Sequence, residues 1–96
     1  MTAYSHVVKP VDITPDANHT AVTRFAGFTV RESAGTAAAA AVNFRHGTVS
    51  GQILWVLELA ANSSDGVVFP GYMSTPDGVY VQAVSGTVSG ELLELT

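Results

Sequence analysis

Histidine and serine side chains are the residues of this sequence best suited to catalysis or metal binding. His6, His19 and His46 lie far apart and do not repeat the H-x-x-x-H spacing of metal ligands. Ser50 and Ser89 lie in G-x-x-S-G, which differs from the G-x-S-x-G spacing of a nucleophile elbow. These patterns predict no catalytic residue, no metal ligand and no cofactor.

Acidic residues could still act in pairs. Two carboxylates cleave a glycosidic bond when the fold holds them about 5 to 9.5 Å apart over a sugar-binding groove. However, Asp65 and Asp77 each precede a glycine, which is typical of a turn, and Asp65-Gly66 predicts a hairpin. Asp12 and Asp16 lack the remaining ligands of a calcium-binding loop. We therefore predict that the protein is not an enzyme, with a small hydrolase as the alternative.

Aromatic side chains give a second alternative, because sugars stack on exposed aromatic rings. The candidates for such a platform are Trp55, Phe69, Tyr72 and Tyr80. A single tryptophan within an apolar strand is more typical of a core, where aromatic residues bury a large area. A carbohydrate-binding module therefore stays open beside the core interpretation.

The composition limits the partners that the protein can have. Charged residues make up 12% of the chain, against an average of about 25%, and the net charge is −4. So few charges predict that a partner covers part of the surface. The basic residues are scattered singly, so nucleic-acid binding is not expected. They are Lys9, Arg24, Arg31 and Arg45.

Two further absences in the sequence bear on location and stability. There is no cysteine, so packing or assembly has to stabilise the fold without disulfides. No run approaches the roughly twenty apolar residues that span a bilayer, and the first twenty residues do not resemble an export signal. We expect synthesis in the cytoplasm and no membrane association.

The elements that would position these residues are short strands. Residues 22–31 alternate apolar and polar side chains, which indicates a half-buried strand, and residues 52–60 are apolar on both faces. Further strands are predicted at residues 67–69, 79–84 and 91–95, with Pro70-Gly71 closing the first of them. Seven or eight short strands with regular turns predict an all-β antiparallel sandwich, jelly-roll-like or Ig-like, or a small barrel. We assign this domain to residues 21–96.

Residues 1–20 are expected to form an extended N-terminal arm, with a disordered tail as the alternative. Pro10 and Pro15 each remove a main-chain donor, which restricts this segment to an edge strand at most. Its apolar residues are predicted to reach a neighbouring subunit or partner by adding a strand to a sheet edge. They are Val7, Val8, Val11 and Ile13.

Residues 37–41 are five consecutive alanines, for which helix and strand compete. Alanine is the best helix former, but the segment that ends at His46-Gly47 is too short to be helical by itself. We favour a strand, whose small side chains would let another sheet or subunit come close.

One peptide occurs twice with small changes. Residues 47–54 read GTVSGQIL and residues 86–93 read GTVSGELL, in each case turn residues before an apolar run. We interpret both copies as bends that arose separately, with an internal duplication as the alternative. If the strands that follow are neighbours, the bends lie at one end of the sandwich, and that end, with Arg45 and His46, is predicted to bind a partner.

Several segments resemble small all-β minor capsid or decoration proteins of tailed phages, especially phages that infect actinobacteria. The resemblance spans residues 25–95 and is carried by FAGFTVRESAGTAAA at 25–39, FRHGT at 44–48, LAAN at 59–62 and VSGTVSG at 84–90. It implies a structural virion protein on the capsid surface that binds the major capsid protein, often as a homotrimer, and has no catalytic residues. A tail or fibre component is the alternative virion role.

Overall fold

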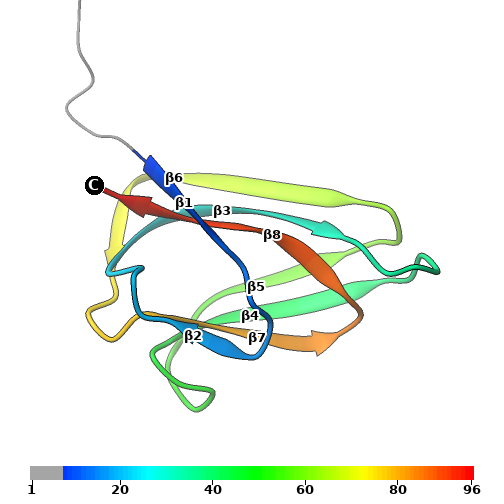
Figure 1. Ribbon diagram of the computed structural model, residues 1–96, viewed down its shortest axis with the longest axis horizontal. Helices are drawn as coiled ribbons and strands as arrows, with labels where there is room; N and C mark the ends of the chain where they lie inside the picture. Colours follow the sequence, from blue (N-terminus) through cyan, green and yellow to red (C-terminus); the bar gives the residue numbers. More distant parts are fainter. Residues whose placement is uncertain (1–7) are drawn as a thin grey trace, which may run out of the picture.

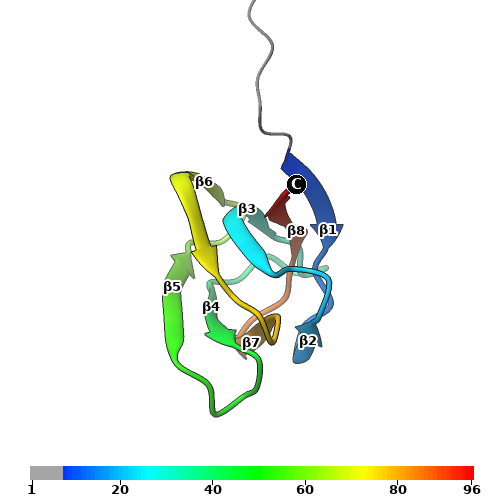
Figure 2. The same ribbon diagram turned by 90° about the vertical axis from the view of Figure 1, so that its left-hand side faces the viewer.

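The computed structural model of the protein describes residues 8–96, which form eight β-strands in two stacked sheets (Figures 1 and 2). The strands are β1 (Val8–Asp12), β2 (Ala17–His19), β3 (Arg24–Glu32), β4 (Ala40–His46), β5 (Ile53–Leu59), β6 (Ser64–Ser74), β7 (Val79–Ser85) and β8 (Val88–Leu95). Sheet A has the order β1-β8-β3-β6, and sheet B has the order β2-β7-β4-β5. The prediction of an all-β antiparallel sandwich is confirmed.

The strand order is that of an eight-stranded jelly roll, in which the chain passes from one sheet to the other at nearly every connection. Only β4 and β5 follow each other within one sheet, as a hairpin. All strand pairs are antiparallel, so each strand can turn one face to the core and the other outward.

The core between the sheets follows from the alternation of apolar residues. Phe28 of sheet A and Phe44 of sheet B are fully buried, and their ring centroids lie 4.7 Å apart. Phe25 and Leu92 are also inaccessible to solvent. Because aromatic rings bury a large area each, this cluster provides much of the apolar burial in a domain of this size.

The first strands belong to the sandwich rather than to a separate arm. β1 pairs with β8 along its whole length, from Val8 opposite Leu95 to Asp12 opposite Glu91. β2 pairs with β7, so the segment crosses from sheet A to sheet B. The described part of the predicted arm, residues 8–20, is therefore not separate from the sandwich, because β8 pairs with one side of β1 and β7 pairs with one side of β2.

The hairpin predicted at Asp65-Gly66 is wrong. Both residues lie inside β6, where Gly66 is opposite Thr29 of β3. The turn occurs earlier, where Ser63 N–H donates to Ala60 O over 3.1 Å and Asn62 takes the positive φ of 60°. Asparagine tolerates this left-handed conformation, so Asp-Gly is not needed for the reversal.

The end predicted for a short strand at Pro70-Gly71 is also wrong, because β6 continues to Ser74. Its pairing with β3 is irregular there, between Phe25 opposite Met73 and Gly27 opposite Val68. β6 is an edge strand, and proline is tolerated at edges and bulges, where its missing N–H leaves no ladder bond broken.

The alanine run is divided between a loop and a strand. β4 begins at Ala40, and residues 37–39 lie before it. The strand that we favoured over a helix is present, but it begins three residues later than the run.

The two copies of the repeated peptide lie at opposite ends of sheet B. Gly47 and Gly86 both have φ of 73°, so each opens a bend. β4 and β7 are antiparallel, with His46 opposite Val79 and Ala41 near Ser85 at the other end. The two bends were expected at one end of the sandwich if the strands after them were neighbours. These strands, β5 and β8, lie in different sheets, so they are not neighbours.

Glu32 lies at the end of β3, where it joins two loops. The residue is buried, with an exposed fraction of 8%. Its carboxylate accepts hydrogen bonds from the main-chain N–H of Asn62 (2.9 Å) and of Ala34 (2.6 Å). These bonds, with a further one from Ala38, hold the pKa of Glu32 below its ordinary value despite the opposing effect of burial.

We expect the ionised Glu32 to stabilise the fold at neutral pH. Because its pKa is lower in the folded state, this contribution is complete above the ordinary glutamate pKa and is lost as pH falls through the lowered value. The unfolding midpoint of Glu32→Gln should therefore lie below that of the wild type near pH 7, and the gap should narrow towards about pH 3. Thermal unfolding across this range, with the exposed Glu58→Gln as control, tests it; a gap independent of pH would contradict it.

Candidate functional site

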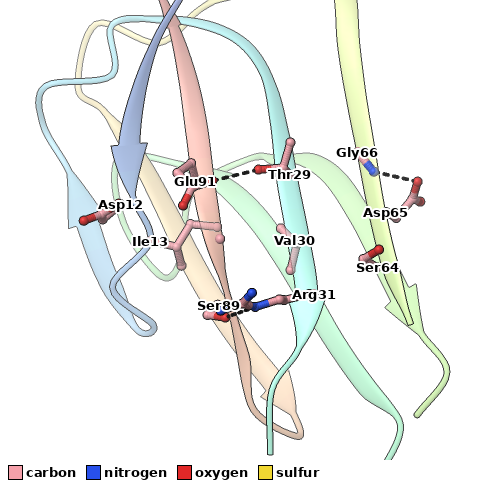
Figure 3. Close-up of a pocket in the computed structure, with 11 residues that line it drawn as sticks. Asp12, Ile13, Thr29, Val30, Arg31, Ser64, Asp65, Gly66, Ser89 and Glu91 are labelled. Carbon is pink, nitrogen blue, oxygen red and sulfur yellow. Dashed lines mark hydrogen bonds between the residues drawn. The ribbon is translucent and has the colours of Figure 1, made fainter. Parts of the chain in front are cut away.

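An open groove lies over the outer face of sheet A (Figure 3). It has a volume of about 740 Å³ and is bordered by all four strands of that sheet. A groove of this size is within the range of ligand sites, about 300–1,000 Å³.

Small residues create the groove. At its centre Thr29 of β3 faces Glu91 of β8 on one side and Gly66 of β6 on the other. Gly66 has no side chain, so the surface beside Thr29 is left open. A Cβ atom at Gly66 would lie against the side chain of Thr29. Two residues further along β3, Arg31 lies between the short side chains of Ser64 and Ser89.

The groove is polar and already ordered by internal hydrogen bonds. Arg31 Nε donates to Ser89 Oγ over 2.9 Å, and Thr29 Oγ1 donates to Glu91 Oε1 over 3.1 Å (Figure 3). At the rim, Gly66 N–H donates to Asp65 Oδ1 over 2.8 Å. Asp12 adds a third carboxylate to those of Asp65 and Glu91.

This arrangement has the chemistry of a binding surface. Three carboxylates and one guanidinium line the groove, so it favours an elongated ligand with hydrogen-bond donors and positive charge. The guanidinium of Arg31, which uses Nε to bind Ser89, can also bind one acidic or carbonyl group of such a ligand. An extended segment of another protein meets both requirements.

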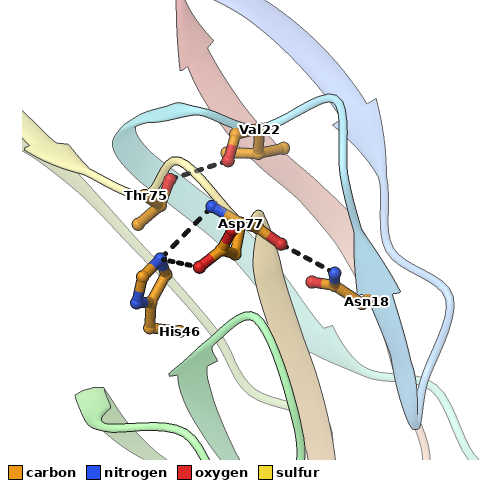
Figure 4. A network of polar contacts seen from close by, with 5 residues as sticks. All are labelled: Asn18, Val22, His46, Thr75 and Asp77. Atoms are coloured by element: carbon orange, nitrogen blue, oxygen red, sulfur yellow. Dashed lines mark hydrogen bonds and ion pairs between the residues drawn. The ribbon is translucent and has the colours of Figure 1, made fainter.

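His46 lies at a different place, the corner between β4 and the turn before β7 (Figure 4). Its Nε2 accepts a hydrogen bond from the main-chain N–H of Asp77 (3.3 Å) and lies 3.8 Å from Asp77 Oδ2. Asn18 Nδ2 donates to Asp77 O (2.8 Å), and Thr75 Oγ1 donates to Val22 O (2.7 Å). These contacts fix the turn predicted at Asp77-Gly78, which gives His46 a structural role.

Arg45 is also engaged within the chain. Its Nε donates to Gln82 Oε1 over 2.8 Å, and its Nη1 donates to Gly51 O over 2.9 Å. Arg45 therefore connects β7 with the loop after β4. The predicted partner contact through Arg45 and His46 stays a prediction, at a site remote from the groove.

The remaining histidines do not extend this corner. His19 is buried, with Nε2 accepting from Thr14 N–H (2.9 Å) and Nδ1 3.0 Å from Val79 O. Nδ1 therefore holds β2 against β7, and Nε2 fixes the loop between β1 and β2. His6 lies outside the described residues.

The apolar residues predicted to reach a partner are partly used by the chain itself. Val11 and Ile13 pack against the core, and Ile13 also borders the groove. Val8 is 37% exposed at the start of β1. Val7 lies outside the described residues. The main chain of β1 pairs with β8 of the same molecule. The sequence predicted such edge pairing with a neighbouring subunit or partner instead.

The aromatic candidates do not gather at the groove. Trp55 closes the side of the core, with ring centroids 5.9 Å from Phe28 and 5.5 Å from Phe69. Tyr72 is 51% exposed and lies beneath the guanidinium of Arg24. Among residues 8–96, those that line the groove include no aromatic side chain. The core interpretation of Trp55 fits these contacts.

The sequence did not point to the groove. Thr29 and Arg31 were placed on the outer face of their strand by alternation, but Ser89 and Glu91 were assigned to a turn and a separate strand. The signal that could have joined them is the alternation continuing from Val88 through Gly90 to Leu92, which marks one long strand. Which strand lies next to it is not encoded locally.

The described residues contain no helix that is long and apolar enough to cross a membrane, and no cluster of three or more His, Asp or Glu side chains suited to a metal ion. Comparisons of the chain with protein-family models, with curated proteins and with solved structures found no match.

Proposed function

We propose that this protein is a structural component of a phage virion, which binds the major capsid protein on the outside of the shell. The observation that carries the proposal is the open polar groove on sheet A, which is suited to an extended protein segment. The low content of charged residues, 12% of the chain, supports a partly covered surface. Support for the capsid itself comes from the resemblance of residues 25–95 to decoration proteins.

The jelly-roll strand order is compatible with this role. Eight-stranded jelly rolls occur in viral capsid domains, but also in lectins and cupins, so the fold supports several functions by analogy only. A decoration protein would make the same contact at many symmetry-related positions, and the resemblance favours a trimer there.

We expect Ser64→Arg to weaken binding to capsids at least about tenfold, which corresponds to about 1.4 kcal/mol. Ser64 borders the groove at one end of β6, and an arginine there would fill the space beside Arg31 and repel it. Co-sedimentation of the purified protein with shells of the encoding phage measures the effect. Ser74→Arg, at the other exposed end of the same strand, is the matched control.

The two variants separate a groove contact from a general charge effect. Equal binding of Ser64→Arg and Ser74→Arg would contradict the groove as the contact. Cryo-electron microscopy of intact particles tests the role itself, because a shell without density for this chain would contradict it.

A carbohydrate-binding role is the second candidate, favoured by the carboxylates and hydroxyl groups of the groove. Sugar sites commonly add an aromatic ring for stacking, and the groove-lining residues include none. Titration with soluble oligosaccharides, followed by NMR shifts of Thr29 and Ser89, distinguishes the two functions.

A further inference from the structure

Strand β5 forms one edge of sheet B and lies along the outer side of the molecule (Figure 2). Its outward main-chain groups have no neighbouring strand in the described chain. Edge strands of this kind pair readily with other chains unless a proline, a lysine, a bulge or short length prevents it.

The other three edges carry such protection. β1 contains Lys9 and Pro10, and β6 contains Pro70 and an irregular stretch. β2 has only three residues. β5 also has a bulge, near Leu54, but this bulge lies at its start, and the strand then runs regularly from Trp55 to Leu59 without proline or lysine.

The outer face of β5 is apolar and exposed. Val56 is 58% exposed and Ile53 is 44% exposed, although both belong to an ordered strand. Glu58 is the only charged residue of β5, and its side chain is exposed. Apolar side chains beside unpaired main-chain groups favour the addition of a strand.

We propose that β5 pairs with β5 of a second copy of this chain, antiparallel and about a two-fold axis at Val56. This register places Val56 against Val56 of the second copy. It also places Glu58 next to the bulge at Leu54 of the second copy, so the two glutamates do not face each other. An axis at Leu57 would instead set Val56 against the charged Glu58, and this register is less favourable.

The contact is self-complementary, as a two-fold interface requires. Pairing joins the two copies of sheet B into one sheet of eight strands, whose faces continue across the axis. The two copies of sheet A then lie on the same side of the dimer. This dimer does not depend on the capsid proposal and differs from the trimer that the resemblance implies.

Cysteine substitution tests the register directly, because the chain contains no cysteine. In Val56→Cys the two thiols face each other across the axis, with Cβ atoms about 4.5–5.5 Å apart before adjustment. Val84→Cys is the matched control, since Val84 is 55% exposed on β7, two strands away from the edge. Val84 would lie about 24 Å from Val84 of the second copy, five strand spacings of about 4.8 Å.

We expect Val56→Cys to form a disulfide-linked dimer under mild oxidation roughly ten times faster than Val84→Cys. Light scattering should give the wild-type protein twice the mass of one chain. Val56→Lys should raise the dimer dissociation constant at least about tenfold, while Val84→Lys leaves it unchanged. Both lysine variants should keep the far-ultraviolet circular dichroism of the wild type.

Three outcomes would overturn the proposal. They are equal cross-linking of the two cysteine variants, a wild-type mass of one or three chains at micromolar concentration, or a folded Val56→Lys that dimerises as tightly as Val84→Lys. Because these measurements use the purified protein alone, capsid binding can fail or succeed independently of them.

Discussion

Gly90→Ala is expected to lower the free energy of unfolding by about 4 kcal/mol, a large part of the 5–15 kcal/mol typical of a domain. Gly90 lies inside β8 with φ of 147°, a conformation that L-residues rarely adopt. A Cβ atom at this position would overlap the main-chain oxygen of Thr29 on β3. To remove this overlap, β8 has to move away from β3 beside the groove.

Urea unfolding followed by circular dichroism measures this effect. Gly71→Ala is the matched control, because a Cβ atom at Gly71 meets nothing within 4 Å. This variant should stay within about 0.5 kcal/mol of the wild type. Equal midpoints for Gly90→Ala and Gly71→Ala would contradict the close approach of β3 and β8.

Phe28→Ala is expected to cost about 3–5 kcal/mol, since it removes a fully buried ring and leaves a cavity between the sheets. The ring contacts Phe44 of the opposite sheet at 4.7 Å and Trp55 at 5.9 Å between centroids. Loss of this ring should therefore loosen both the contact between the sheets and the side closed by Trp55.

The only tryptophan gives a local measurement for this variant, because Trp55 contacts Phe28 directly. Its fluorescence should shift to longer wavelength in folded Phe28→Ala, and the unfolding midpoint should fall. Tyr72→Ala, which removes a half-exposed ring, should change stability by less than about 1 kcal/mol. Similar stabilities of the two variants would contradict the central place of Phe28.

The parts of the fold that could be predicted are those encoded by local alternation. The pattern around Phe28 and Val30 predicted a half-buried strand, and the turn at Asp77-Gly78 was located from its residue types alone. These features depend on near neighbours in the sequence, which set the face of a strand or the φ of a turn.

The features that were missed depend on distant partners. Asp65-Gly66 is capable of a turn, yet pairing with Thr29 draws it into a strand. β1 carries the composition of a terminal arm, yet β8 provides an edge for it. The groove joins four strands from both ends of the chain, so no single segment could reveal it.

The pairing of β1 with β8 also has a kinetic consequence. Val8 is opposite Leu95, so this ladder closes a loop that contains nearly the whole chain. The entropy of closing such a loop is lost before the contacts form, and folds dominated by such pairings take milliseconds to seconds to form. Until β1 docks, β8 remains an open edge, so a chain whose β1 is still unpaired can mispair there with another copy.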